Sequence, residues 1–345
     1  MKNKCVLPFI SHDYQRKTPC CVLTNYKNKD DLDQLLQDHL DDKRSRYCEV
    51  CWKTEEAGIK SKRQYYNQTY SQYVQQEHRS TILSVIPVGN VCNLNCVTCH
   101  PKFSTSWFKK YQSMYPGSNY SKDNVLNDID LDQVSNLDYL KHIEFIGGET
   151  LMSKSLWKYL RNIPADSSFS LQTNGTYKLT PYHVKTLSKF NKFNICFSLD
   201  GYGKIFEYLR QPANWGQVSD NIKQYSEALG NDNLSIYITI SNLNIFYIDK
   251  IVLNLFKFLP VKIDLNPVLH DVFGYENLCP DVGAIVERNN PVFFKTKKFK
   301  WRGTADSNLS ILENLRKQDA FSGRKFSDYL PEFYEVLKNK TPAKE

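Results

Sequence analysis

The chain has 345 residues, a formal net charge of +8 at neutral pH, 41% hydrophobic residues and 24% charged residues. These values are typical of a soluble globular protein, and the absence of any run of about 18 apolar residues excludes a membrane-spanning helix. A chain of this length can bury one large core and one small additional core. The apolar part of the N-terminus is too short for a secretion signal, so we expect a cytoplasmic protein without a membrane partner.

Residues 1–78 are polar, rich in tyrosine and short of long periodic apolar segments. Five of the ten cysteines lie here: Cys5, Cys20, Cys21, Cys48 and Cys51. In a reducing compartment such closely spaced cysteines favour metal or cluster ligation over disulfides. We therefore expect a small module whose core is too poor to fold without a metal or cluster.

Residues 79–270 alternate between apolar strand-like and helix-like segments of similar length. The expected strands are 81–90, 141–148, 167–175, 193–201, 234–242 and 261–268. The expected helices are 105–115, 131–140, 151–163, 181–190, 215–229 and 248–259. Such alternation predicts an α/β fold in which parallel strands and right-handed crossovers form a partial, TIM-like (β/α)6 barrel.

Polar residues gather where the predicted strands end. "GGE" ends at Glu149, "TNG" contains Asn174, and "SLDG" contains Ser198 and Asp200. In β/α barrels the carboxyl ends of the strands form the rim on which active sites are built. The loop that follows the first predicted strand opens at the same rim.

Residues 271–345 are rich in loops, with helices expected at 309–318 and 330–340 on the outside of the barrel. The lysine-rich segment 293–302 is interpreted as solvated lysines on an aromatic-flanked strand. Contact with nucleic acid is the less favoured alternative.

Three cysteines follow the first predicted strand with the spacing C-x3-C-x2-C: Cys92, Cys96 and Cys99. A closed zinc site needs four ligands, whereas a [4Fe–4S] cluster held by three thiolates keeps one iron open for a small molecule. A zinc site completed by His100 would be strained, because His100 directly follows Cys99. The haem motif C-x2-C-H would leave Cys92 unexplained and would require an exported chain.

This cysteine triad, followed by Gly147, Gly148 and Glu149 at the end of the next predicted strand, resembles the signature of radical S-adenosylmethionine (AdoMet, SAM) enzymes over residues 81–268. The resemblance implies a [4Fe–4S] cluster that binds AdoMet and cleaves it reductively to a 5′-deoxyadenosyl radical, which abstracts hydrogen from the substrate. It also implies an electron donor such as a flavodoxin or ferredoxin. Thr98 departs from the pattern, since many members carry an aromatic residue there.

The resemblance also implies residues that contact AdoMet, in addition to the catalytic cysteines Cys92, Cys96 and Cys99. These residues are Gly147, Gly148, Glu149, Thr150, Asn174, Ser198, Asp200 and Arg210. The two glycines would let the backbone approach the methionine part, and Arg210 would clamp a carboxylate through two parallel hydrogen bonds. Three alternatives stay open: a helix-capping glycine turn, an ordinary Asn-Gly turn, and a surface ion pair for Arg210.

The N-terminal cysteines resemble the twitch domain, a short relative of the SPASM domain that binds one auxiliary [4Fe–4S] cluster. The motif C-x2-C-W-x2-E-E-x-G-x2-S-x-R, from Cys48 to Arg63, fits the group in which this domain precedes the barrel. The implied ligands are Cys5, Cys48, Cys51 and either Cys20 or Cys21, which gives about eight irons per chain with both clusters. A four-thiolate zinc site is one alternative, and an unpaired Cys5 is a separate one.

The leading hypothesis is therefore a radical SAM enzyme with an auxiliary cluster, acting on a peptide or protein or on a small molecule. The alternative of another class is a zinc-stapled nucleic-acid-binding protein, which the positive charge and the 22 tyrosines would suit. A radical SAM enzyme that acts on nucleic acid combines the two.

Overall fold

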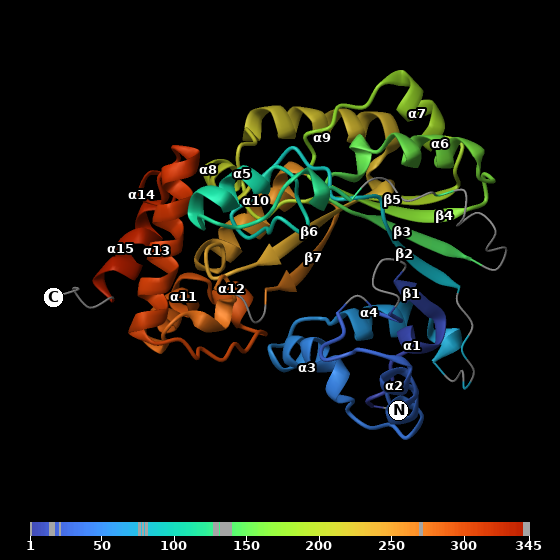
Figure 1. Ribbon diagram of the computed structural model, residues 1–345, viewed down its shortest axis with the longest axis horizontal. Helices are drawn as coiled ribbons and strands as arrows, with labels where there is room; N and C mark the ends of the chain where they lie inside the picture. The colour runs from blue at the N-terminus through green and yellow to red at the C-terminus, as the bar shows by residue number, and fades with distance from the viewer. Residues whose placement is uncertain are drawn as a thin grey trace.

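The computed structural model describes residues 2–13, 18–20, 22–74, 77, 79, 82–126, 131, 140–268 and 272–340. Its centre is a parallel sheet whose seven strands follow the order β1 to β7 (Figure 1). The strands are β1 (Ser11–Asp13), β2 (Leu83–Pro87), β3 (His142–Ile146), β4 (Ser168–Thr173), β5 (Lys192–Ser198), β6 (Leu234–Ile240) and β7 (Lys262–Pro267).

The predicted α/β fold with a parallel sheet is confirmed, and each of the six expected strands is present. Strand β1 was not predicted. It comes from the N-terminal residues and pairs with β2, with Ser11 opposite Leu83. Three residues are too few for a periodic pattern to reveal a strand. The N-terminal residues thus extend the edge of the sheet.

Helices follow the strands as the alternation predicted. They are α5 (Trp107–Met114), α6 (Lys154–Asn162), α7 (Pro181–Leu187), α8 (Lys204–Leu209), α9 (Trp215–Leu229) and α10 (Ile248–Phe258). In α9, the Asn214 side chain caps the first turn by accepting from Gln217 N. Most of the helix expected at 131–140 lies outside the described residues, and α8 was not predicted.

Short 3-10 turns complete the connections. They are η1 (Arg46–Cys48), η2 (Ser71–Tyr73), η3 (Lys122–Asn124), η5 (Thr150–Met152), η6 (Asn231–Asn233), η7 (Ile245–Tyr247) and η8 (Tyr275–Asn277). No helix in the described part of the chain combines the length and the apolar character that crossing a membrane would require.

The N-terminal residues form four helices, α1 (Leu7–Ile10), α2 (Lys29–Leu40), α3 (Glu49–Glu56) and α4 (Lys62–Thr69). The motif from Cys48 to Arg63 contains helix α3, a turn and the start of helix α4. The Glu55 carboxylate links the two helices. Glu55 accepts from Ser61 Oγ (2.5 Å) and from Arg63 Nε (2.9 Å) and Nη2 (2.6 Å). Gly58 supplies the positive φ of 71° that the turn between the helices needs.

The C-terminal helices are α11 (Pro280–Asn289), α12 (Pro291–Phe294), α13 (Ala305–Ser322), α14 (Phe326–Tyr329) and α15 (Pro331–Asn339). The prediction of a strand within residues 293–302 is wrong. After α12 the chain continues as an irregular segment. Phe299 is buried there, and Lys298 N donates to Ala57 O (3.0 Å). The segment is therefore packed against other parts of the chain and does not form a strand.

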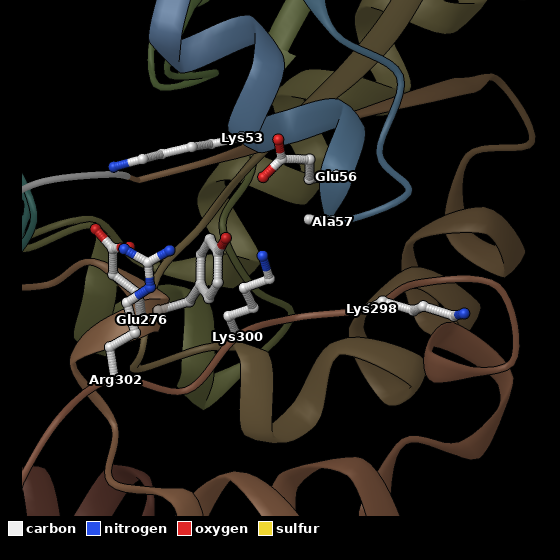
Figure 2. Close-up of a pocket in the computed structure, with 8 residues that line it drawn as sticks. Lys53, Glu56, Ala57, Glu276, Lys298, Lys300 and Arg302 are labelled. Carbon is white, nitrogen blue, oxygen red and sulfur yellow. The ribbon is translucent and has the colours of Figure 1, made fainter.

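A small polar pocket marks the place where this segment meets the N-terminal residues, between α3 and residues 275–302 (Figure 2). Its lining is Lys53, Glu56, Ala57, Tyr275, Glu276, Lys298, Lys300 and Arg302. Its two carboxylates lie among four cations. The hydrogen bond from Arg44 lowers the pKa of Glu56 most, and the charges of Lys300 and Arg302 lower it further. The basic segment therefore faces acidic groups of the chain itself.

His142, at the start of β3, predicts a pH-dependent stability. Burial, aided by the charge of Lys192, lowers the His142 pKa to about 4, and Nδ1 lies 2.8 Å from Ser168 Oγ. The unfolded chain binds a proton near pH 6.5 and the folded chain does not, so stability is lost as the pH falls from about 6.5 towards about 4. Between pH 7 and 5 this one ring should account for up to about 2 kcal/mol.

Urea unfolding of the His142→Gln variant at pH 7 and pH 5 tests this. The variant should lose less stability than the parent chain over that interval. His39, whose pKa is also lowered to about 4, titrates equally in both proteins and cancels in the comparison. Equal losses in the two proteins would show that His142 does not titrate as expected.

Candidate functional site

The cysteine triad occupies the loop after β2, at the carboxyl end of the sheet. Cys96 is buried, and Cys92 and Cys99 are partly buried. Burial raises the pKa of all three thiols, and it raises that of Cys99 to about 11. The thiols also act on one another, because Cys92 raises the pKa of both Cys96 and Cys99. The Arg210 guanidinium counteracts this by lowering each pKa. Such thiols stay protonated in the absence of a metal, and a metal centre that binds the thiolate would displace the proton to solvent.

The backbone of the cysteine loop is fixed on two sides, by the end of α8 and the start of α5. The hydrogen bonds are Asn95 N to Gln211 O (2.8 Å), Val97 N to Leu209 O (2.8 Å), Ser106 Oγ to Cys92 O (2.6 Å) and Trp107 Nε1 to Cys96 O (2.9 Å). These bonds hold the loop and leave the thiols available as ligands, although Cys92 Sγ also accepts from Leu94 N (3.4 Å).

A buried lysine supports the same loop. Lys110 is fully buried, and its Nζ donates to Asn95 O (3.0 Å) and Gln211 Oε1 (3.3 Å) and lies 4.5 Å from the Trp107 ring centre. Burial lowers the Lys110 pKa to about 8, although Cys96 acts in the opposite direction. The sequence interpretation missed this residue. Its helical spacing from Trp107, on the apolar face of α5, is the signal that would have found it.

The C-terminal helices brace the segment onto which the loop docks. The bracing bonds are Gln318 Nε2 to Val97 O (3.1 Å), Tyr208 Oη to Asp319 Oδ1 (2.8 Å), and Arg324 Nη2 to the carbonyls of Pro212 (2.9 Å) and Ala213 (3.2 Å). Residues of α13 thus contact the cysteine loop itself, a role that the sequence did not predict.

The two glycines after β3 pack directly against the chain that enters the cysteine loop. A Cβ on Gly148 would lie 2.3 Å from Val91 O and 2.7 Å from the carbonyl of Asn90. A Cβ on Gly147 would lie 2.7 Å from Gly89 O. Because the two glycines have no side chains, their backbone can lie directly against the backbone of residues 89–91. Contact of the glycines with bound methionine stays a prediction.

Glu149 ties the ends of β3 and β4 together. Its buried carboxylate accepts from Leu151 N (3.2 Å), Thr173 Oγ1 (2.7 Å) and Asn174 N (2.7 Å), and it caps η5. Burial raises the Glu149 pKa, and these hydrogen bonds oppose that shift. Thr150 makes a similar tie by donating from Oγ1 to Gln172 O. The helix-capping alternative thus describes part of the role of Glu149.

Asn174 lies beside the first cysteine of the triad. Its Nδ2 donates to Asn93 Oδ1 (2.9 Å) and lies 3.9 Å from Cys92 Sγ, while its Oδ1 accepts from Thr176 N (2.9 Å). The position agrees with a site at the rim. The Asn-Gly turn and the contact with Cys92 occur together, so one interpretation does not exclude the other.

Arg210 and Asp200 form a buried ion pair, with Arg210 Nε 2.8 Å from Asp200 Oδ2. Asp200 also accepts from Thr239 N (2.8 Å), and Asn244 Nδ2 donates to Asp200 O (2.9 Å). The ion-pair alternative for Arg210 is therefore present, but the side chain is 12% exposed and not on the surface. Ser198 is partly exposed at the end of β5.

Replacing Arg210 by methionine should destabilise the protein by about 3–5 kcal/mol, because Asp200 would be left as a buried charge without its partner. Urea unfolding measures the loss. The double variant Arg210→Met/Asp200→Asn should recover part of it, since the unpaired charge is then removed. Equal losses in the single and double variants would show that the ion pair is not the cause.

Three of the predicted N-terminal ligands share one buried region: Cys5, Cys48 and Cys51. Burial raises the pKa of each, and the other two thiols raise that of Cys5 further. Cys20 packs in the same apolar cluster as Cys5, and Cys21 lies outside the described residues. Among the described residues, no three His, Cys, Asp or Glu side chains converge closely enough to hold a single ion. Ligands of a cluster bind different irons and need not converge on one point.

Comparison with solved structures finds distant likenesses. AnSMEcpe with bound AdoMet is 17% identical, with 70% of this chain and 60% of that chain covered and a TM-score of 0.40. Streptococcus suis SuiB bound to its precursor peptide SuiA is 13% identical, with coverages of 64% and 48% and a TM-score of 0.37. TYW1 with a lysine-pyruvate adduct is 15% identical, with coverages of 80% and 79% and a TM-score of 0.32. The chain thus spans about three fifths of the anSMEcpe chain.

No curated protein sequence matches the chain. Residues 86–254, in contrast, match the family described as the Radical SAM superfamily. The matched region runs from β2 into α10 and contains the cysteine triad, the glycine turn and Arg210. Residues 86–254 therefore form a domain of the radical SAM superfamily, which is a superfamily of enzymes.

Proposed function

We propose that Cys92, Cys96 and Cys99 hold a [4Fe–4S] cluster with one iron open to AdoMet. The observation that supports this most is the donor set itself. Three thiols lie close together on a fixed loop at the rim of the sheet, with the cations of Arg210 and Lys110 beside them. Such a cluster, when bound and reduced, supplies the electron that cleaves AdoMet to the radical that removes hydrogen from a substrate.

The chain's own residues then perform three tasks. The backbone hydrogen bonds of the cysteine loop keep the thiolates in place before any ligand arrives. The positive charges of Arg210 and Lys110 favour the thiolate form over the buried thiol. Polar groups at the ends of β4 and β5, from Asn174 and Ser198, lie at the rim where AdoMet would bind.

For the N-terminal residues we propose an auxiliary [4Fe–4S] cluster on Cys5, Cys48 and Cys51 and a fourth ligand, with zinc as the alternative metal. The resemblance of the Cys48–Arg63 motif to the twitch domain supports the cluster. The same resemblance supports a peptide or protein as the substrate, with a small molecule as the alternative.

Anaerobic purification followed by reconstitution with iron and sulfide tests the proposed function. We expect a brown protein with broad visible absorption, which forms 5′-deoxyadenosine and methionine from AdoMet when dithionite or reduced flavodoxin is added. A colourless protein with stoichiometric zinc would contradict the proposal and favour the zinc-stapled nucleic-acid-binding alternative.

A further inference from the structure

A histidine on a largely polar helix is completely buried beside the N-terminal cysteines. Helix α2 carries eight residues that are Lys, Asp, Gln or His, yet the ring of His39 is 0% exposed, as is Leu35 one turn earlier. Burying an imidazole without a polar partner is costly. Both ring nitrogens of His39 should therefore have polar partners.

The partners of the ring determine its tautomer. Nδ1 lies 3.2 Å from Asn3 O, and a carbonyl oxygen can only accept, so Nδ1 carries the hydrogen. Nε2 is then the unprotonated nitrogen, and its lone pair faces Cys48 Sγ at 3.6 Å. Histidines that bind metals show this arrangement, with one N–H held by a carbonyl and the other nitrogen free.

The same environment contains the three thiols. Arg63 lies among them: its Nη1 donates to Lys4 O (2.9 Å), next to Cys5, and its guanidinium lies 4.6 Å from the ring centre of Trp52, next to Cys51. Arg63 itself cannot act as a ligand, because it stays protonated and is bound to Glu55. A metal centre that replaced the proton of Cys48 would lie beside Nε2 of His39, which is 3.6 Å from Cys48 Sγ.

We propose that His39 is the fourth ligand of the N-terminal iron–sulfur site, through Nε2, in place of a thiolate from Cys20 or Cys21. The inference rests on the proposed auxiliary cluster and is independent of the AdoMet site. Exchange of a thiolate for a neutral imidazole makes the cluster less negative and easier to reduce. The N-terminal cluster would then accept an electron more readily than one held by four thiolates.

The test uses the full-length Cys92→Ala/Cys96→Ala/Cys99→Ala variant, so that only the N-terminal site can hold iron. After anaerobic reconstitution with iron and sulfide we expect about four irons per chain. Pulsed EPR of the reduced cluster should show strong ¹⁴N coupling from a directly bound imidazole. Adding His39→Cys should retain the iron and abolish the nitrogen coupling, because a thiolate replaces the ring.

The matched control is Cys20→Ala/Cys21→Ala in the same background, which should retain both the iron and the nitrogen coupling. If the cluster of the triple-alanine variant, with all its N-terminal residues unchanged, shows no ¹⁴N coupling, the inference is overturned. This result does not depend on whether the other variants fold. Loss of the cluster in the cysteine control, with retention in His39→Ala, would overturn it as well. Binding of zinc without iron would overturn both this inference and the auxiliary cluster, and would leave the AdoMet site untouched.

Discussion

Replacing Cys92, Cys96 and Cys99 together by alanine should abolish the formation of 5′-deoxyadenosine from AdoMet. It should also lower the iron content from about eight to about four per chain. The three thiols lie on one loop whose shape depends on backbone hydrogen bonds to other groups, so their removal should leave the loop and the fold intact. Iron analysis and chromatography of the reaction products measure the two effects.

The control for this variant is Cys196→Ala. Cys196 is also buried, but it lies within β5, and we interpret it as a packing residue. Iron content and AdoMet cleavage should be unchanged in this control. Continued formation of 5′-deoxyadenosine by the triple variant would refute the assignment of the catalytic cluster to these cysteines.

The strands and helices of the central sheet were predictable where their pattern was long enough. Strands β2 to β7 each have five to seven residues and follow or precede a periodic helix, which makes the alternation visible. Strand β1 has three residues, and helix α8 has six and no side-chain cap. Their conformation depends on pairing and packing with distant segments, which single-sequence patterns do not reveal.

In the candidate site, too, some residues could be predicted from sequence patterns and others could not. Spacing alone identified the cysteine triad and the glycine turn, because their chemistry requires those residue types close together. The supporting contacts depend on the folded chain. Lys110 reaches the loop from α5, and Gln318 reaches it from a helix more than 200 positions later in the sequence. Arg210 and Asp200 were each expected to face a ligand, and the structure pairs them with each other.

The tight packing of the glycine turn leads to the second large effect. Gly148→Ala would place a Cβ 2.3 Å from Val91 O and 2.7 Å from the carbonyl of Asn90, and neither is a side chain that can swing away. The turn and the cysteine loop must then separate, at a cost of about 1–3 kcal/mol. Because Val91 immediately precedes Cys92, the thiolates would be misplaced. AdoMet cleavage should fall on the order of 100-fold, with reduced iron content.

The matched control is Gly216→Ala, which adds the same methyl group within helix α9. Its Cβ would meet only Asn214 Oδ1, the tip of a side chain, at 3.1 Å. Alanine is favoured over glycine inside a helix by about 1 kcal/mol, which offsets a small shift of the Asn214 cap. Stability should therefore change little, and AdoMet cleavage should be unaffected. If Gly148→Ala matched this control in iron content and rate, the cysteine loop could not depend on the close approach of the two backbones.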